Sequence, residues 1–225
     1  MEAEKKVRAI ITGATGMVGE GVLHECLNHP RVEKVLVIGR KSCGVTQERL
    51  TEIILPDFSK LRSVESELGG FNACFFCAGV SSIGMKEEQY FELTYRLTMG
   101  FAETLACINP AMSFCYVSGA GTDSTEKGRM MWARVKGKTE NDLIKLPFRK
   151  VYNFRPGYMQ PTKGLKYSNP YYKYITWLYP ILRKVFPNRV TTLAEVGQAM
   201  IHAVSAGYGK NGVEVRDILT LSRQF

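Results

Sequence analysis

Short apolar runs alternate along the chain with longer segments whose apolar residues recur at helical spacing. The short runs predict strands at 7–12, 34–39, 51–56, 72–78, 112–118, 150–155 and 212–221. The longer segments predict helices near 17–28, 59–68, 86–107, 129–145 and 192–205. Apolar strands that alternate with helices are typical of a parallel sheet covered on both faces. We therefore predict an α/β fold, a Rossmann-type doubly wound parallel sheet of about seven strands, in one domain over residues 1–225.

Residues 158–190 depart from this alternation. They are rich in aromatic and basic side chains, and a single straight helix is prevented by Pro170, Pro180 and Pro187. We expect a small C-terminal cap segment over the carboxyl edge of the sheet. Lysines and arginines beside tyrosines in 163–189 would also suit a weak contact with an anionic membrane surface.

Positive charge is concentrated in the same part of the chain. The net charge is +9, and the segment from Leu143 to Ala194 holds ten of the 30 basic residues and none of the 21 acidic ones. This distribution favours anionic ligands or surfaces, although a solubilising basic face explains it equally well. No nucleic-acid-binding motif accompanies the charge, so nucleic acid is not expected as a partner.

The N-terminal sequence MEAEKKVRAI is charged and lacks the apolar run of a secretory signal. With no apolar stretch of about 18 residues either, we expect a cytoplasmic protein with mostly free thiols. Cys74 and Cys77 form C-x-x-C inside the apolar run FNACFFCAG, without a second such pair. Packing on opposite faces of a buried strand is favoured over chemistry, and no metal site is expected.

A glycine-rich turn follows the first predicted strand. The stretch TGATGMVG places glycines where a tight turn, a close approach to a pyrophosphate and close helix packing are needed in a dinucleotide site. The N–H groups at the start of the next helix would face the phosphates. The strand, turn and helix occur in the required order, which predicts contacts from Gly13, Thr15, Gly16, Met17, Val18 and Gly19.

The second predicted strand ends at Gly39 and is followed by Arg40 and Lys41. An NAD site usually has a carboxylate here, which accepts a hydrogen bond from the ribose 2′-hydroxyl. A carboxylate would repel a 2′-phosphate, whereas arginine can pair with it. We therefore predict that NADP(H) is favoured over NAD(H). The alternative is that Arg40 is only a surface charge at the end of a strand.

These ordered motifs resemble those of the short-chain dehydrogenase/reductase superfamily, in its extended or atypical branch of NAD-dependent epimerases and dehydratases. The nearest resemblance is to the Tat-interacting-protein-like oxidoreductases, and it covers about Lys6 to Pro161 through the motifs TGATGMVG, PDF, CAG, YVSGAG and FRPGYMQP. It implies a Rossmann fold with Ser118 at the catalytic centre. It also implies coenzyme contacts from Asp57, Phe58, Cys77, Ala78, Gly79, Lys136, Arg155, Pro156 and Gly157.

One catalytic position departs from this family. Its members usually carry Tyr-x-x-x-Lys after the fifth strand, where the lysine holds the nicotinamide ribose and lowers the tyrosine pKa. This chain has Trp132 and Lys136 at the matching positions. An indole N–H donates a hydrogen bond but exchanges no proton near neutrality, so Trp132 could polarise a carbonyl or wall the pocket. Tyr158, after the sixth strand, is a candidate substitute for the missing phenol.

Three functions stay open. The first is an NADP(H)-dependent oxidoreductase, or an epimerase-like enzyme, acting on a small carbonyl, hydroxyl or sugar-nucleotide substrate. The second is a catalytically weak nucleotide-sensing or scaffold protein. The third is a protein that contacts anionic membranes through residues 163–189.

Overall fold

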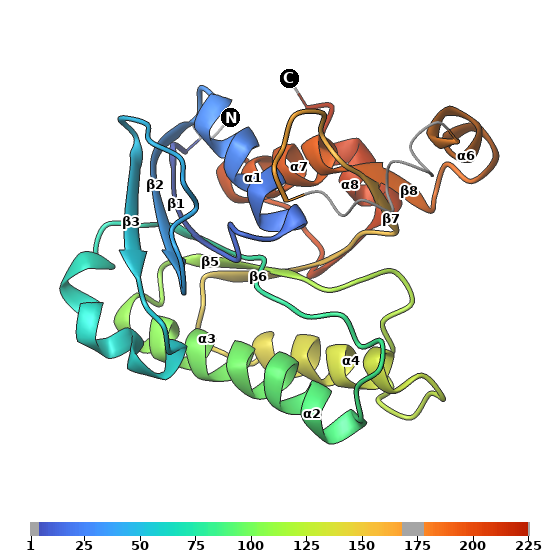
Figure 1. The fold of residues 1–225 in the computed structure, drawn as a ribbon, viewed down its shortest axis with the longest axis horizontal. Coiled ribbons are helices and arrows are strands. Elements are labelled where there is room, and N and C mark those ends of the chain that lie inside the picture. The colour runs from blue at the N-terminus through green and yellow to red at the C-terminus, as the bar shows by residue number, and fades with distance from the viewer. Residues whose placement is uncertain (1–4, 168–177, 225) are drawn as a thin grey trace.

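The protein was analysed as a computed structural model that describes residues 5–167 and 178–224 (Figure 1). Seven strands form a sheet in the order β3-β2-β1-β4-β5-β6-β9, and every neighbouring pair runs parallel. Their bounds are β1 Val7–Thr12, β2 Val32–Gly39, β3 Leu50–Ile54, β4 Ala73–Phe76, β5 Ser113–Val117, β6 Lys150–Arg155 and β9 Gly212–Glu214. The predicted Rossmann-type α/β fold is confirmed.

Helices cover both faces of this sheet (Figure 1). One face carries α1 (Met17–Asn28), α7 (Leu193–Ser205) and α8 (Val215–Leu221). The other carries the 3₁₀ segment η1 (Phe58–Glu67), α2 (Glu87–Phe91), the π-helical turn η2 (Glu92–Arg96), α3 (Leu97–Ile108) and α4 (Met131–Leu143). The strands are therefore apolar on both sides, which is why they read as continuous apolar runs in the sequence.

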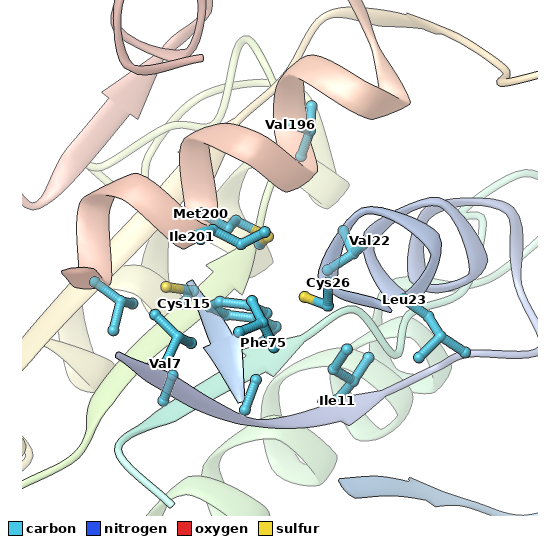
Figure 2. Packing of buried hydrophobic residues seen from close by; sticks show 14 of the residues in the cluster. Val7, Ile11, Val22, Leu23, Cys26, Phe75, Cys115, Val196, Met200 and Ile201 are labelled. Atoms are coloured by element: carbon cyan, nitrogen blue, oxygen red, sulfur yellow. The ribbon is translucent and has the colours of Figure 1, made fainter. Parts of the chain in front are cut away.

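Two apolar clusters form the core, one on each face of the sheet. Because side chains alternate along a strand, Ile11 packs against α1 and α7 whereas Ile10 packs on the opposite side. Figure 2 shows the first cluster, in which Cys26 from α1 and Met200 from α7 meet above the sheet. Cys74 and Cys77 pack on opposite faces, as predicted, and all six cysteines are free thiols. No helix among the described residues is long and apolar enough to cross a membrane.

The predicted strand at 212–221 is wrong beyond Glu214. The backbone N–H of Glu214 donates to the Asp217 carboxylate (3.0 Å), and this capping box begins α8. Within α8 the buried residues are Val215, Ile218 and Leu221, whose spacing of three matches a helix and not a strand. The apolar residues that suggested a strand instead place one helical face in the core.

Residues 158–190 leave the main sheet. Their described parts form β7 (Tyr158–Gln160), which pairs in parallel with β8 (Val190–Thr192), and the short helix α6 (Tyr179–Val185). A Cβ atom on Gly157 would lie 2.1 Å from the carbonyl oxygen of Arg189, so the two ends of this segment pack directly on each other. Pro170 lies outside the described residues, and the role of the segment as a cap stays a prediction.

Candidate functional site

The turn between β1 and α1 has a backbone that only glycine can adopt. Gly13 has a φ of +71°, and a Cβ there would lie 2.7 Å from the backbone nitrogen of Ala78. A Cβ on Gly19 would lie 2.1 Å from the carbonyl oxygen of Gly13. The turn therefore packs directly on the end of β4, and α1 packs directly on the turn.

The first turn of α1 has no side-chain cap. Gly16, the residue before the helix, is extended, and its N–H donates to the carbonyl oxygen of Gly13 (2.9 Å). The N–H groups at the start of α1 thus lack a side-chain acceptor and, together with the helix dipole, favour an anion. The fold directs this helix start toward the carboxyl edge of the sheet, where ligands bind in open α/β sheets.

A pocket of about 900 Å³ lies beside this turn, which is within the usual size of a ligand site. The pocket brings together ten predicted coenzyme contacts from four loops: Gly13, Thr15, Gly16, Arg40, Lys41, Asp57, Phe58, Cys77, Ala78 and Gly79. These residues follow β1, β2, β3 and β4, the four neighbouring strands on one side of the sheet. The remaining predicted contacts do not line it: Met17, Val18, Gly19, Lys136, Arg155, Pro156 and Gly157.

The pocket has two cations after β2 and one carboxylate after β3. Arg40 and Lys41 are exposed and make no ion pair or side-chain hydrogen bond with any residue in the described part of the chain. Asp57 is also exposed, and its side chain accepts from the backbone N–H of Ser59 (2.9 Å) at the start of η1. This hydrogen bond lowers the pKa of Asp57 below its usual value and so stabilises the ionised carboxylate. Phe58 packs on Phe101 with ring centres 5.3 Å apart.

Tyr167 forms one wall of the pocket and was not predicted from the sequence. The carboxylate of Glu20, in the first turn of α1, accepts from the backbone N–H groups of Lys166 (2.6 Å) and Tyr167 (2.7 Å). This pair of hydrogen bonds places a residue far along the chain beside the β1–α1 turn. The position of Glu20 just after the glycine motif is a signal, but the sequence does not show which N–H groups it meets. Leu93 and Leu97 also line the pocket and were not predicted.

Ser118, Trp132 and Lys136 come together after β5. The Thr122 hydroxyl donates to the carbonyl oxygen of Gly119 (2.8 Å), so the Ser118 hydroxyl, 2.8 Å from Thr122 Oγ1, is the donor of that pair. Trp132 is half-buried, and its ring lies 3.6 Å from where a Cβ on Gly121 would be. Its indole therefore covers the loop after β5.

Lys136 lies one turn after Trp132 on α4, on the same helical face. Its ammonium donates to the carbonyl oxygen of Ser118 (2.8 Å) and, at 3.4 Å, to that of Val117. Burial lowers the pKa of Lys136 to about 8, and the nearby carboxylate of Glu140 opposes this shift only in part. Lys136 is thus held at the carboxyl end of β5 and titrates close to physiological pH.

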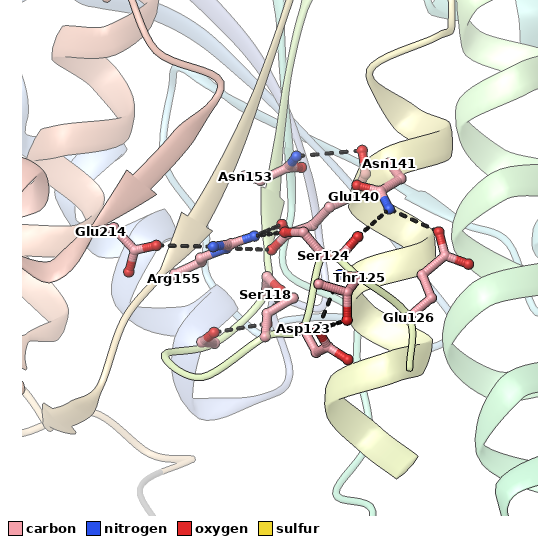
Figure 3. A network of polar contacts seen from close by, with 12 residues as sticks. Ser118, Asp123, Ser124, Thr125, Glu126, Glu140, Asn141, Asn153, Arg155 and Glu214 are labelled. Carbon is pink, nitrogen blue, oxygen red and sulfur yellow. Dashed lines mark hydrogen bonds and ion pairs between the residues drawn. The ribbon is translucent and has the colours of Figure 1, made fainter. Parts of the chain in front are cut away.

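Arg155 forms ion pairs with two glutamates, Glu140 and Glu214 (Figure 3). It does not line the pocket. Its Nε donates to Glu140 Oε1 (3.0 Å), its Nη1 to Glu214 Oε1 (3.0 Å) and its Nη2 to Ser124 Oγ (2.6 Å). Glu140 is only 2% exposed, so this ion pair is buried between α4 and β6. Every nitrogen of the guanidinium has a partner, and Arg155 joins α4, β9 and the loop before α4.

The other predicted residues of this region lie on β7 and before it. The carbonyl oxygen of Pro156 accepts from the N–H of Ala120 (2.9 Å), which connects the end of β6 to the loop after β5. The hydroxyl of Tyr158, on β7, donates to Gln160 Oε1 (3.1 Å). Tyr158 does not line the pocket. Its role as a substitute for the missing phenol stays a prediction.

Comparisons with known proteins identify relatives of the chain. The model of the NAD dependent epimerase/dehydratase family matches residues 9–124. Protein fmp52-1, mitochondrial, of Aspergillus oryzae is 30% identical over 153 residues, which cover 65% of this chain and 63% of that protein. Protein HTATIP2 of Rattus norvegicus is 27% identical over 149 residues, covering 65% and 60%. The match thus spans less than two thirds of the length of either relative.

Solved structures share the fold. The L-sorbose reductase of Gluconobacter frateurii, solved with NADPH and L-sorbose, has a TM-score of 0.64 and 16% identity, covering 93% of this chain and 94% of its own. A UDP-N-acetylglucosamine 4-epimerase from Methanobrevibacter ruminantium has a TM-score of 0.64 and 15% identity, covering 92% and 75%. At these identities the likeness concerns the fold alone.

The predicted cytoplasmic location is wrong by these comparisons. Relatives from Aspergillus oryzae, Emericella nidulans and Scheffersomyces stipitis are all named as mitochondrial proteins. The prediction rested on a charged N-terminus without a secretory apolar run. That pattern argues against secretion but does not distinguish between the compartments inside a cell.

Proposed function

The chain belongs to the NAD-dependent epimerase/dehydratase family, and from this premise we propose that it binds NADP(H) in the pocket beside the β1–α1 turn. The observation that carries the proposal is a pair of cations after the end of β2 that have no ion-pair or side-chain hydrogen-bond partner among residues 5–167 and 178–224. Arg40 and Lys41 line the pocket where a site for NAD usually has a carboxylate. Both are free to pair with a 2′-phosphate, and no acidic residue from the end of β2 competes with them.

The other walls suit the remaining parts of the coenzyme. The uncapped start of α1 and the backbone of Gly13 to Gly16 would hold the pyrophosphate. The ionised carboxylate of Asp57, beside Phe58, would accept from the adenine amino group. Tyr167 would close the pocket on the side of the pyrophosphate, because Glu20 tethers its backbone there.

We further propose that the protein is an oxidoreductase acting on a small carbonyl or hydroxyl compound. The bound coenzyme would supply or accept hydride. Lys136 would hold the nicotinamide ribose from the end of β5, where its ammonium already meets two carbonyl oxygens. Ser118 would turn its hydroxyl from Thr122 toward a substrate oxygen, while the indole of Trp132 would form a wall and donate a hydrogen bond.

The coenzyme proposal is tested by titrating the purified protein with NADPH and with NADH at one ionic strength. Quenching of protein fluorescence and isothermal calorimetry report each dissociation constant. We expect NADPH to bind more tightly. Equal affinities would refute the interpretation of Arg40, and no uptake of either nucleotide would refute the site itself.

The catalytic proposal is tested at Trp132. Trp132→Tyr restores a phenol one turn before Lys136, so we expect NADPH-dependent reduction of an aldehyde and ketone panel to rise above that of the unmodified protein. Trp132→Phe is the matched control, since it has the same ring as tyrosine without the hydroxyl. Activity that rises equally in both variants would show that space, and not a proton donor, was limiting.

A second candidate is a nucleotide-sensing protein with little turnover. It is favoured by the Ser118 hydroxyl, which is buried and already donates to Thr122. If NADPH binds and neither the unmodified protein nor Trp132→Tyr reduces any member of the panel, the sensing function is the better explanation.

A further inference from the structure

Helix α6 projects from the body of the protein at the end away from β3 (Figure 1). Three of its neighbouring apolar side chains are exposed to solvent: Ile181 by 55%, Val185 by 58% and Phe186 by 50%. Elsewhere in the described chain, exposed large apolar residues are scattered singly or in pairs along the sequence. A concentration of three within six residues marks a contact surface more strongly than isolated ones do.

The ion pair on the other side of α6 fixes which side faces outward. Arg183 donates to both carboxylate oxygens of Glu195 at the start of α7, at 2.5 and 3.0 Å, and to the carbonyl oxygen of Val190 at 2.8 Å. Arg183 is two residues from both Ile181 and Val185, or about 200° around a helix. The anchor therefore holds Ile181 and Val185 away from the rest of the protein.

The stretch of sequence that contains α6 carries only positive charges. Lys184 is exposed between Ile181 and Val185, and Arg189 is exposed shortly after the helix ends. No acidic residue occurs anywhere in the sequence between Leu143 and Ala194. Apolar side chains flanked by exposed lysine and arginine are the composition that enters the boundary between headgroups and acyl chains of an anionic bilayer.

We propose that this surface, formed by Ile181, Lys184, Val185, Phe186 and Arg189, docks on an anionic lipid membrane. The apolar side chains would insert at the level of the headgroups, and the two cations would pair with lipid phosphates or carboxylates. A bilayer is favoured over a second protein because the apolar side chains lie on a projecting helix (Figure 1) and are flanked by exposed cations, which complement anionic headgroups. The proposal is independent of coenzyme binding.

The test is co-sedimentation of the full chain with vesicles of phosphatidylcholine alone and of phosphatidylcholine with about 30% phosphatidylserine. We expect pelleting with the anionic vesicles only, reduced when salt is raised from about 50 to 500 mM. Lys184→Ala should lower the partition coefficient about fivefold, because one cation near an anionic surface contributes that much. Ile181→Ser should lower it about tenfold.

Ile83→Ser is the matched control, since Ile83 is 90% exposed but lies before α2, outside the surface. It should leave the partition coefficient unchanged. The proposal is overturned if no pelleting occurs, if phosphatidylcholine alone pellets as much protein, or if Ile181→Ser behaves as Ile83→Ser does. It is also overturned if light scattering shows a dimer that Ile181→Ser dissociates, because the surface would then belong to contacts between copies.

Discussion

Replacing Arg40 with alanine tests the coenzyme preference most directly. The side chain is exposed, lines the pocket and has no partner in the described chain, so its removal breaks no internal contact. Two unit charges 4 Å apart interact by about 1 kcal/mol in water, and a phosphate monoester carries close to two charges. Hydrogen bonds to charged groups contribute about 1.5–3 kcal/mol, with exposed groups at the low end. We expect Arg40→Ala to weaken NADPH binding by about 1.5 kcal/mol, or about tenfold.

The assay is a fluorescence titration of NADPH and NADH against the parent protein, Arg40→Ala and Arg216→Ala. Arg216 is exposed on α8 and does not line the pocket, so it controls for the loss of one positive charge. NADH has no 2′-phosphate, and its affinity should stay within about twofold in all three proteins. An equal loss of affinity for both nucleotides in Arg40→Ala would refute the reasoning, because Arg40 would then contact a part that the two share.

Two further predictions concern α4. NADPH affinity should fall as pH rises through about 8, because Lys136 loses its ammonium charge there. The measurement is a series of NADPH titrations between pH 6 and 10, in which Lys136→Met should no longer show this fall in affinity. Glu140→Ala should lower the free energy of unfolding in urea by about 3–5 kcal/mol, since it leaves the partly buried Arg155 with an exposed carboxylate and the Ser124 hydroxyl as partners. The matched control is Glu214→Ala, which removes a carboxylate that is 52% exposed and should lower the free energy of unfolding by at most about 1 kcal/mol. Equal losses of stability in both variants would contradict the assignment of Arg155 and Glu140 as the buried ion pair.

At Arg155 the sequence motif predicts the local turn but not the side chains that pair with the guanidinium. The sequence FRPGYMQP indicates the turn after the sixth strand, and the structure has β6 end at Arg155. The partners of the guanidinium come from α4, from the loop before it and from the end of β9. These partners reach Arg155 because β9 pairs with β6 in the sheet, although 56 residues lie between the end of β6 and the start of β9.

Local sequence patterns are enough to predict those parts of the protein that depend on interactions between neighbouring residues. Continuous apolar runs specified strands that are buried on both faces, and the spacing of apolar residues between them specified helices. The glycines of TGATGMVG specified the turn, since Gly13 has a positive φ and Gly19 has no room for a side chain. These requirements act within a few residues, so they can be seen without the fold.

The tertiary structure alone decided which distant groups meet. Glu20 accepts from the N–H groups of Lys166 and Tyr167, almost 150 residues away, and so supplies a wall of the pocket that no pattern indicated. The end of the chain became a helix after Glu214 because its apolar residues fill the core at a spacing of three, against their strand propensity. A carboxylate or an apolar side chain has many candidate partners in a sequence, and packing in three dimensions selects one of them.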